Sequence, residues 1–195
     1  MSTRLGVLLS GGGTTLENLY DVIGKGELDA EVAIVVSSRP DVEGLRRASS
    51  RNTPTLVVQH EGDDDAFSGT IAGALRAAHV DLVLLAGFMR FWSIPGDFEG
   101  RVLNIHPALL PRHGGPGCYG RRVHQAVLDS GDAETGCTVH FADNIYDHGP
   151  VILQRRIPVL RGDTVDSLAE RVFAQECVAY PDAIQRVLSG ETTAG

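Results

Sequence analysis

The chain has 195 residues, of which 43% are hydrophobic and 22% are charged, and its formal net charge is −8. These values are typical of a globular domain, and no apolar run approaches the roughly 20 residues that span a membrane. The acidic balance argues against a nucleic-acid partner, and the absence of a signal-peptide pattern at the N-terminus predicts a cytoplasmic protein. Three widely spaced cysteines favour reduced thiols over a disulfide framework.

Apolar runs alternate with amphipathic helical patterns through the first hundred residues. Because continuous apolar strands separated by helices are typical of a parallel sheet, we expect helices on both of its faces. The predicted class is α/β: a single-domain, doubly wound, mostly parallel sheet, Rossmann-like in its N-terminal half. The predicted strands are residues 5–9, 32–36, 55–58 and 82–85, with helices after residues 13, 40 and 66.

The second half combines strands, a long loop and two helices. We expect strands at 102–105, 137–141 and 151–159, an extended Pro/Gly-rich loop at 107–120 and helices at 121–130 and from residue 164. Pro181 should kink or restart the last helix. The predicted organisation is one domain over residues 1–190, with halves at 1–100 and 101–190 and a loose tail at 191–195.

A glycine run, Gly11 to Gly13, separates the first predicted strand from the first helix. Thr14 and Glu17 form a capping-box pattern, which predicts that the helix begins there. Glycines permit close approach of a ligand, and free amides at a helix start favour anions, so the run is a candidate phosphate site. It lacks the lysine of a P-loop and the spacing of a dinucleotide fingerprint. The alternative is a tight turn that binds nothing.

Asn104 and His106 lie at the end of a predicted strand, and Pro107 directs the chain out of the sheet. Side chains two residues apart share one face of a strand, so these two should project together. An amide beside an imidazole can stabilise an oxyanion and move a proton, although a lone histidine is more often structural.

Asp147 lies in a polar loop, residues 143–150, between the two late strands. A carboxylate near His106 would favour the protonated imidazole and raise its pKa above the usual ~6.5. Asp, Asn, Gly and Pro are also ordinary turn residues, so a solvated turn is the alternative. Spacing alone does not bring Asp147 to His106.

Together these segments resemble the glycinamide ribonucleotide transformylase family of folate-dependent formyltransferases. The resemblance covers about residues 4–190 in order and spacing. The matching segments are Ser-Gly-Gly-Gly-Thr-Thr at 10–15, Leu-Ala-Gly-Phe-Met-Arg at 85–90, Asn-Ile-His-Pro-Ala-Leu-Leu-Pro at 104–111, Gly-Cys-Thr-Val-His at 136–140 and Asp-His-Gly-Pro-Val-Ile at 147–152, followed by Gln175-Glu176 and Tyr180-Pro181.

The resemblance implies formyl transfer from 10-formyltetrahydrofolate, the co-substrate, to the amine of glycinamide ribonucleotide in de novo purine biosynthesis. It implies small-molecule partners, no metal, and a monomer or homodimer. It implies a phosphate-binding N-terminal half and a catalytic, folate-binding second half. The implied catalytic residues are Asn104, His106 and Asp147. The implied phosphate ligands are Gly12, Gly13, Thr14 and Thr15, with Glu176 on the ribose. The implied folate-pocket residues are Met89, Arg90, Phe91, Trp92 and Asn104.

Some positions depart from the family pattern. Thr14-Thr15 replaces a common Ser-Asn, and His148 replaces a glycine after Asp147. His140 is expected near the site as a structural side chain, and the loop at 114–120 is long, with no assigned role. Two other functions stay open: a sister formyl-chemistry enzyme, such as a formyltetrahydrofolate hydrolase or a tRNA or sugar formyltransferase, and a non-enzymatic nucleotide- or folate-binding module.

Overall fold

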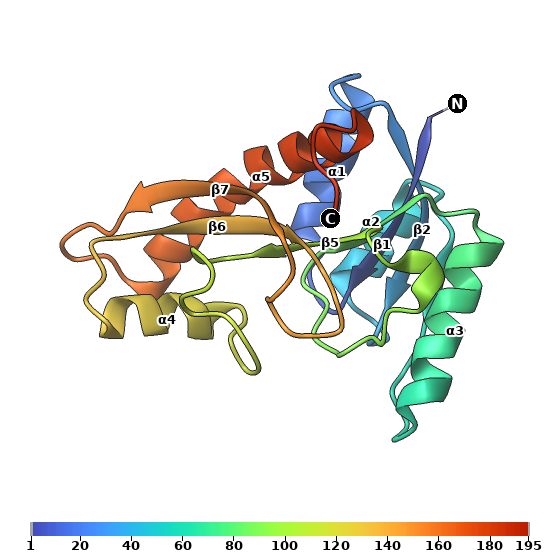
Figure 1. Cartoon of the computed structure of the whole chain (residues 1–195), viewed down its shortest axis with the longest axis horizontal. Helices are drawn as coiled ribbons and strands as arrows, with labels where there is room; N and C mark the ends of the chain where they lie inside the picture. Colours follow the sequence, from blue (N-terminus) through green and yellow to red (C-terminus); the bar gives the residue numbers. More distant parts are fainter. Residues whose placement is uncertain (1, 195) are drawn as a thin grey trace. The chain divides into compact units, whose positions relative to one another are not determined.

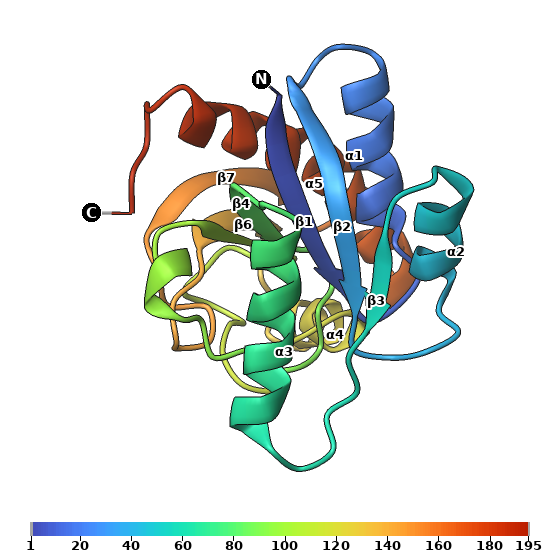
Figure 2. The ribbon, with the colours of Figure 1, turned by 90° about the vertical axis from the view of Figure 1, so that its right-hand side faces the viewer.

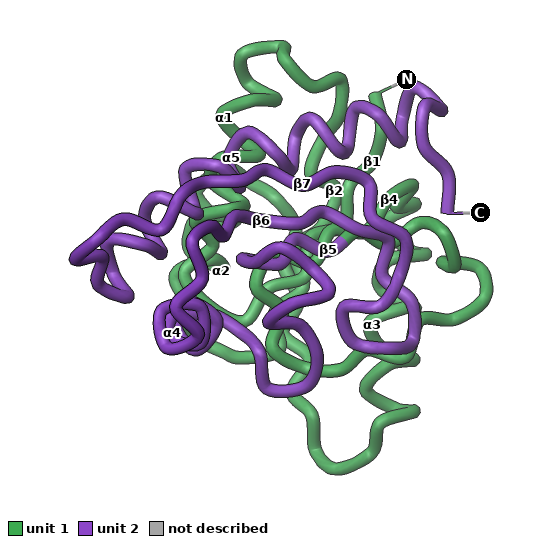
Figure 3. Tube along the Cα trace, turned by 60° about the vertical axis from the view of Figure 1, so that its left-hand side comes forward, with its two compact units in different colours: residues 1–103 green, residues 104–195 purple. Residues whose placement is uncertain are grey.

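The computed structural model describes residues 2–194, and the chain divides between Leu103 and Asn104 into two compact units, coloured separately in Figure 3. Within residues 2–194, no helix combines the length and the apolar character needed to cross a membrane. The predicted one-domain organisation with a loose tail stays a prediction.

The first unit alternates strands and helices, as predicted. The strands β3, β2, β1 and β4 are hydrogen-bonded neighbours in that order, and the three pairings are all parallel. The parallel α/β arrangement expected for this half is therefore confirmed. The elements are β1 (Thr3–Leu9), α1 (Thr14–Gly24), β2 (Ala30–Ser37), α2 (Glu43–Ser50), β3 (Thr55–Val57), α3 (Asp64–Ala77), β4 (Leu82–Leu85) and a 3-10 turn (Gly96–Phe98).

Two residues of β1 show that helices cover both faces of these strands. A Cβ atom on Gly6 would meet the side chain of Leu75 in α3, so this position faces α3. The side chain of Leu9 lies against Gly44 of α2. Residues three apart on a strand point to opposite faces, so α3 and α2 pack on opposite sides. Figure 2 shows α3 across the strands from α1 and α2.

The second unit contains the late strands and two helices. Strands β5, β6 and β7 are neighbours in that order, β6 and β7 pair antiparallel, and α5 packs against both of them and against α4 (Figure 1). The elements are β5 (Val102–His106), whose last three residues begin this unit, α4 (Arg121–Asp129), β6 (Glu134–Phe141), β7 (Val151–Pro158) and α5 (Val165–Leu188).

The predicted capping box at α1 is wrong. Gly13 is the N-cap, in the left-handed conformation, and no side chain caps the helix. Thr14 is thus already the first helical residue, while Glu17 pairs instead with Arg47 at 3.1 Å and Arg51 at 2.5 Å. A capping box does open α5, where Thr164 and Ser167 bond each other's backbone amides. This helix continues through Pro181 without restarting.

Candidate active site

The structure brings Asn104, His106 and Asp147 together within the second unit. Asn104 and His106 are alternate residues at the end of β5, so their side chains project from one face. Asn104 Nδ2 and His106 Nδ1 each lie 3.4 Å from the same carboxylate atom, Oδ1 of Asp147. An amide, an imidazole and a carboxylate therefore converge on one point, which the sequence spacing alone could not show.

The loop between β6 and β7 places Asp147. Its backbone has a φ of 53°, in the left-handed region that Asp tolerates better than most residues. Its Oδ2 atom accepts a 2.8 Å hydrogen bond from the amide of Gly115. Two residues later, Gly149 packs so closely that an added Cβ would overlap the carbonyl oxygen of Phe141. The loop is therefore shaped by backbone contacts at both sides of the carboxylate.

His106 is held at both ring nitrogens. Its Nε2 atom lies 2.8 Å from the carbonyl oxygen of His113. A carbonyl oxygen only accepts, so Nε2 carries the hydrogen of the neutral ring and the Nδ1 lone pair faces Asp147. The nitrogen of His106 that faces Asp147 is therefore Nδ1, and it is the one that can accept a proton in the neutral ring.

The expectation of a raised His106 pKa is wrong. The side chain is only 4% exposed, and burial lowers the pKa of His106 below its ordinary value, although Asp147 and the His113 carbonyl act in the opposite direction. The desolvation of a charged ring outweighs an ion-pair partner at 3.4 Å. The imidazole is thus mainly neutral at neutral pH.

Asp147 stays ionised. Burial on its own would raise the pKa of Asp147, but a hydrogen bond with His140, the positive charge that His106 carries once it is protonated, and the Gly115 amide outweigh burial and hold the pKa below its ordinary value. The carboxylate is therefore available to stabilise a positive charge that forms on the neighbouring imidazole.

His140 belongs to the same cluster. It is 1% exposed, its Nδ1 donates to the carbonyl of Phe141 at 2.8 Å, and its Nε2 therefore accepts from Asn104 Nδ2 at 3.1 Å. The expected position near the site is confirmed. The Asn104 amide is oriented by both neighbours. Its Nδ2 donates to His140, and the opposite orientation would place the amide oxygen against the Asp147 carboxylate.

The glycine run forms an uncapped helix start in the first unit. Thr14, Thr15 and Leu16 are the first three helical residues, whose amides have no acceptor inside the helix. Gly12 is exposed, and an added Cβ there would meet nothing within 4 Å. Gly13 differs, because it has a φ of 70° and its Cβ would lie 2.6 Å from the Gly44 Cα atom. Phosphate binding by Gly12 to Thr15 stays a prediction.

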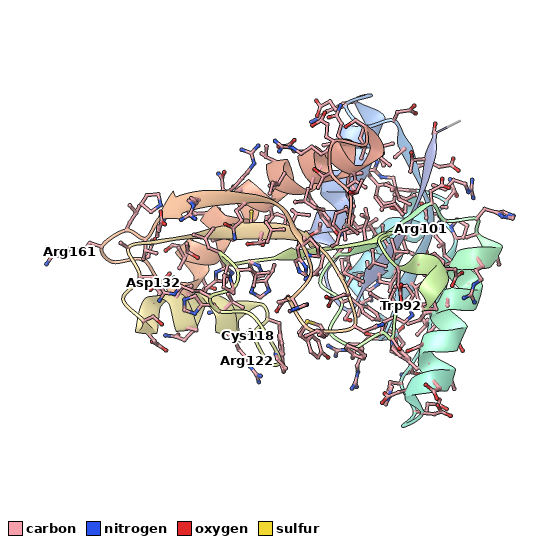
Figure 4. The ribbon with its side chains drawn as sticks, viewed as in Figure 1. Trp92, Arg101, Cys118, Arg122, Asp132 and Arg161 are labelled. Atoms are coloured by element: carbon pink, nitrogen blue, oxygen red, sulfur yellow. The ribbon has the colours of Figure 1, made fainter. Side chains whose placement is uncertain are left out.

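The four residues predicted to border a folate pocket have different surroundings. Met89 and Phe91 are 46% and 38% exposed, and Arg90 is also exposed. Trp92, labelled in Figure 4, is 4% exposed, donates from Nε1 to the Ser68 carbonyl at 3.2 Å and packs on Phe98. The indole is buried in the core of its unit, which argues against the expectation that its ring contacts a ligand.

Glu176 lies on α5 in the second unit and is half-buried. Burial raises the pKa of Glu176 to about 7. Glu176 lies in the same unit as Asn104, His106 and Asp147, whereas the glycine run and residues 89–92 belong to the other unit.

Comparison with known proteins identifies the family. Residues 3–184 match the family described as formyl transferase. The chain belongs to this family. Glycinamide ribonucleotide transformylase 1 from Symbiobacterium toebii is 40% identical, over 97% of this chain and 89% of that one, with a TM-score of 0.91. Phosphoribosylglycinamide formyltransferase from Coxiella burnetii, solved with CHES, is 33% identical over 100% and 91%, with a TM-score of 0.91. These scores confirm the predicted fold class.

A longer relative contains a similar segment. The trifunctional purine biosynthetic protein adenosine-3 of Gallus gallus is 42% identical over 98% of this chain, which covers 19% of that protein. This chain thus spans about a fifth of the length of that relative.

Proposed function

We propose that this chain transfers the formyl group of 10-formyltetrahydrofolate to the amine of glycinamide ribonucleotide, giving the N-formyl product and tetrahydrofolate in de novo purine biosynthesis. The observation that carries the proposal is the convergence of Asn104 and His106 on one carboxylate oxygen of Asp147. Support comes from relatives named for this activity that match almost the whole chain.

In the proposed reaction, the substrate amine attacks the formyl carbon and a tetrahedral oxyanion forms. Asn104 Nδ2 would donate to this oxyanion the hydrogen that otherwise faces Asp147 Oδ1 at 3.4 Å, while the other hydrogen stays on His140. Such a donor is often worth ~3–4 kcal/mol. The proton released by the amine moves to Nδ1 of neutral His106, and Asp147 stabilises the imidazolium. The carbon–nitrogen bond to the folate then breaks, and His106 returns the proton to the leaving nitrogen. No covalent enzyme intermediate is required.

This scheme changes one expectation from the sequence. The sequence suggested a protonated His106 with a raised pKa. Burial instead lowers the pKa of His106, so the ring is neutral before the substrates react. The neutral ring first accepts a proton and then donates it. Asp147 stabilises the His106 imidazolium that exists between these two proton transfers.

The remaining ligand contacts are part of the proposal. The free amides at Gly12 to Thr15 would bind the substrate phosphate, and Glu176 would accept hydrogen bonds from the ribose. Met89, Arg90 and Phe91 would border the folate. We also propose a cytoplasmic enzyme that acts on small molecules as a monomer or homodimer.

An assay of formyl transfer to glycinamide ribonucleotide, followed by folate absorbance, tests the proposal. We expect turnover with this amine and none with other amines offered as controls. Release of formate without an acceptor would identify a hydrolase instead. Tight folate binding without any turnover would identify a binding module.

A further inference from the structure

The loop that contacts His106 and Asp147 is itself bonded to a residue outside the candidate site. The segment from Pro107 to Gly120 connects β5 to α4 and supplies two main-chain groups to the cluster. The His113 carbonyl oxygen lies 2.8 Å from His106 Nε2, and the Gly115 amide donates to Asp147 at 2.8 Å. The position of this short stretch therefore sets the surroundings of both catalytic side chains.

Asp132 holds this stretch from the other side. It follows α4, where its amide bonds the Val127 carbonyl, and Figure 4 labels it beside that helix. Its Oδ2 atom lies 2.7 Å from His113 Nε2, and its Oδ1 atom accepts from Arg112 at 2.6 Å. The side chains of Asp132 and His113 are 10% and 13% exposed, whereas Arg112 is 67% exposed. The contact of Asp132 with His113 is therefore shielded from solvent, whereas its contact with Arg112 is not.

We infer that Asp132 is a positioning residue for His106, acting through His113. The side chain of His113 is fixed on Asp132, and its carbonyl is thereby fixed on His106 Nε2. The carbonyl selects the neutral ring with its hydrogen on Nε2, which leaves the Nδ1 lone pair toward Asn104 and Asp147. This inference rests on the proposed function, in which Nδ1 accepts the proton.

The competing tautomer explains why an anchor matters. Nδ1 lies 3.4 Å from the Asp147 carboxylate, and a hydrogen on Nδ1 would be attracted to that charge. With hydrogen there, the neutral ring cannot accept the amine proton. The 2.8 Å bond to the His113 carbonyl offsets this preference only while the loop is held. Gly114 and Gly115 follow His113 directly, so the chain itself supplies little stiffness.

Nitrogen NMR of the His106 ring at neutral pH is the deciding measurement, because it requires no activity. In the wild type we expect hydrogen on Nε2. In Asp132→Ala we expect a shift toward hydrogen on Nδ1, together with a fall in kcat of about 10-fold and little change in either KM. Asp129→Ala is the matched control, since Asp129 is exposed and its carboxylate accepts from Gln125 of the same helix. It should match the wild type.

A double-mutant cycle tests the route through His113. His113 has a φ of 57°, so His113→Gly removes the side chain while keeping a backbone conformation that glycine favours. We expect His113→Gly to reproduce the loss seen in Asp132→Ala, and the double variant to lose no more than either single one. Arg112→Ala should stay within about 2-fold of the wild type.

The outcomes separate the inference from the proposed function. An unchanged His106 tautomer in Asp132→Ala, or additive losses in the double variant, would overturn the positioning role. A tautomer shift in an enzyme that fails to formylate glycinamide ribonucleotide would support the role and reject the proposed substrate.

Discussion

His106 Nδ1 and Asp147 Oδ1 face each other at 3.4 Å in the interior of the second unit. This distance exceeds that of a normal charged hydrogen bond, which is about 2.7–2.9 Å. The carboxylate therefore favours the charged imidazole by electrostatic attraction but does not overcome the cost of burial.

Replacing Asp147 by Asn should lower the His106 pKa further. The substitution removes the group that opposes burial most strongly. NMR titration of the His106 ring in both proteins measures the shift. Asp143→Asn, in the same loop but paired with exposed His148, is the control and should leave the His106 pKa unchanged. An equal or higher pKa in Asp147→Asn would show that the pair is not coupled.

His106→Ala and Asp147→Asn should each reduce turnover by at least ~100-fold without loss of the fold. The first removes the proton acceptor, and the second removes the charge that stabilises the imidazolium. Steady-state assays of the purified, folded variants check this, with the exposed neighbour changed in His148→Ala as the comparison. Near-normal turnover in either folded variant would remove that residue from the mechanism.

Gly12→Val should weaken binding of the ribonucleotide by at least ~10-fold while thermal stability and folate affinity stay unchanged. Its new side chain would enter open space next to the free helix-start amides. Gly13→Val is a poorer test, because Gly13 is left-handed and touches Gly44. Calorimetric titration with the ribonucleotide measures the affinity, and Gly24→Val at the other end of α1 is the control. Unaltered affinity would leave the phosphate site unlocated.

Glu176→Gln should stabilise the free protein at pH 8 but not at pH 4. A pKa raised from 4.5 to about 7 means that the folded wild type resists ionisation. The resulting penalty is absent below the ordinary pKa, grows as pH rises toward 7 and is complete above it. After discounting for partial exposure it amounts to about 1–3 kcal/mol. Urea unfolding at both pH values measures it, with exposed Glu170→Gln as the control. A pH-independent difference would contradict the burial argument.

The strand and helix pattern of this chain could be predicted because it is local. The apolar run at 82–85 coincides with β4, and Thr164 caps α5 as its position suggested. The start of α1 was mispredicted at the cap, since a left-handed Gly13 shifts Thr14 into the helix. Periodicity records which residues are apolar, but not the backbone conformation of a glycine.

The resemblance gives the proposed catalytic trio and an expected position for His140 near it, but it does not point to the loop residues around the trio. His113 and Gly115 contact His106 and Asp147 through main-chain atoms, and the residue types in a sequence do not reveal such contacts. Asp132 is connected to the site through the side chain of His113. The direction of the His106 pKa was also mispredicted, because it depends on burial that spacing cannot reveal. A histidine followed 19 positions later by an aspartate carries no recognisable pattern.

His113 and Asp147 are both left-handed, at φ values of 57° and 53°. Glycine adopts this conformation more readily than either residue, but it would lose the contact of His113 with Asp132 and that of Asp147 with the Gly115 amide. Selection of variants for survival at high temperature therefore sets relief of the backbone against loss of these contacts. A survivor with glycine at either position would also lack a side chain that the proposed reaction uses, so such a selection needs an activity screen beside it.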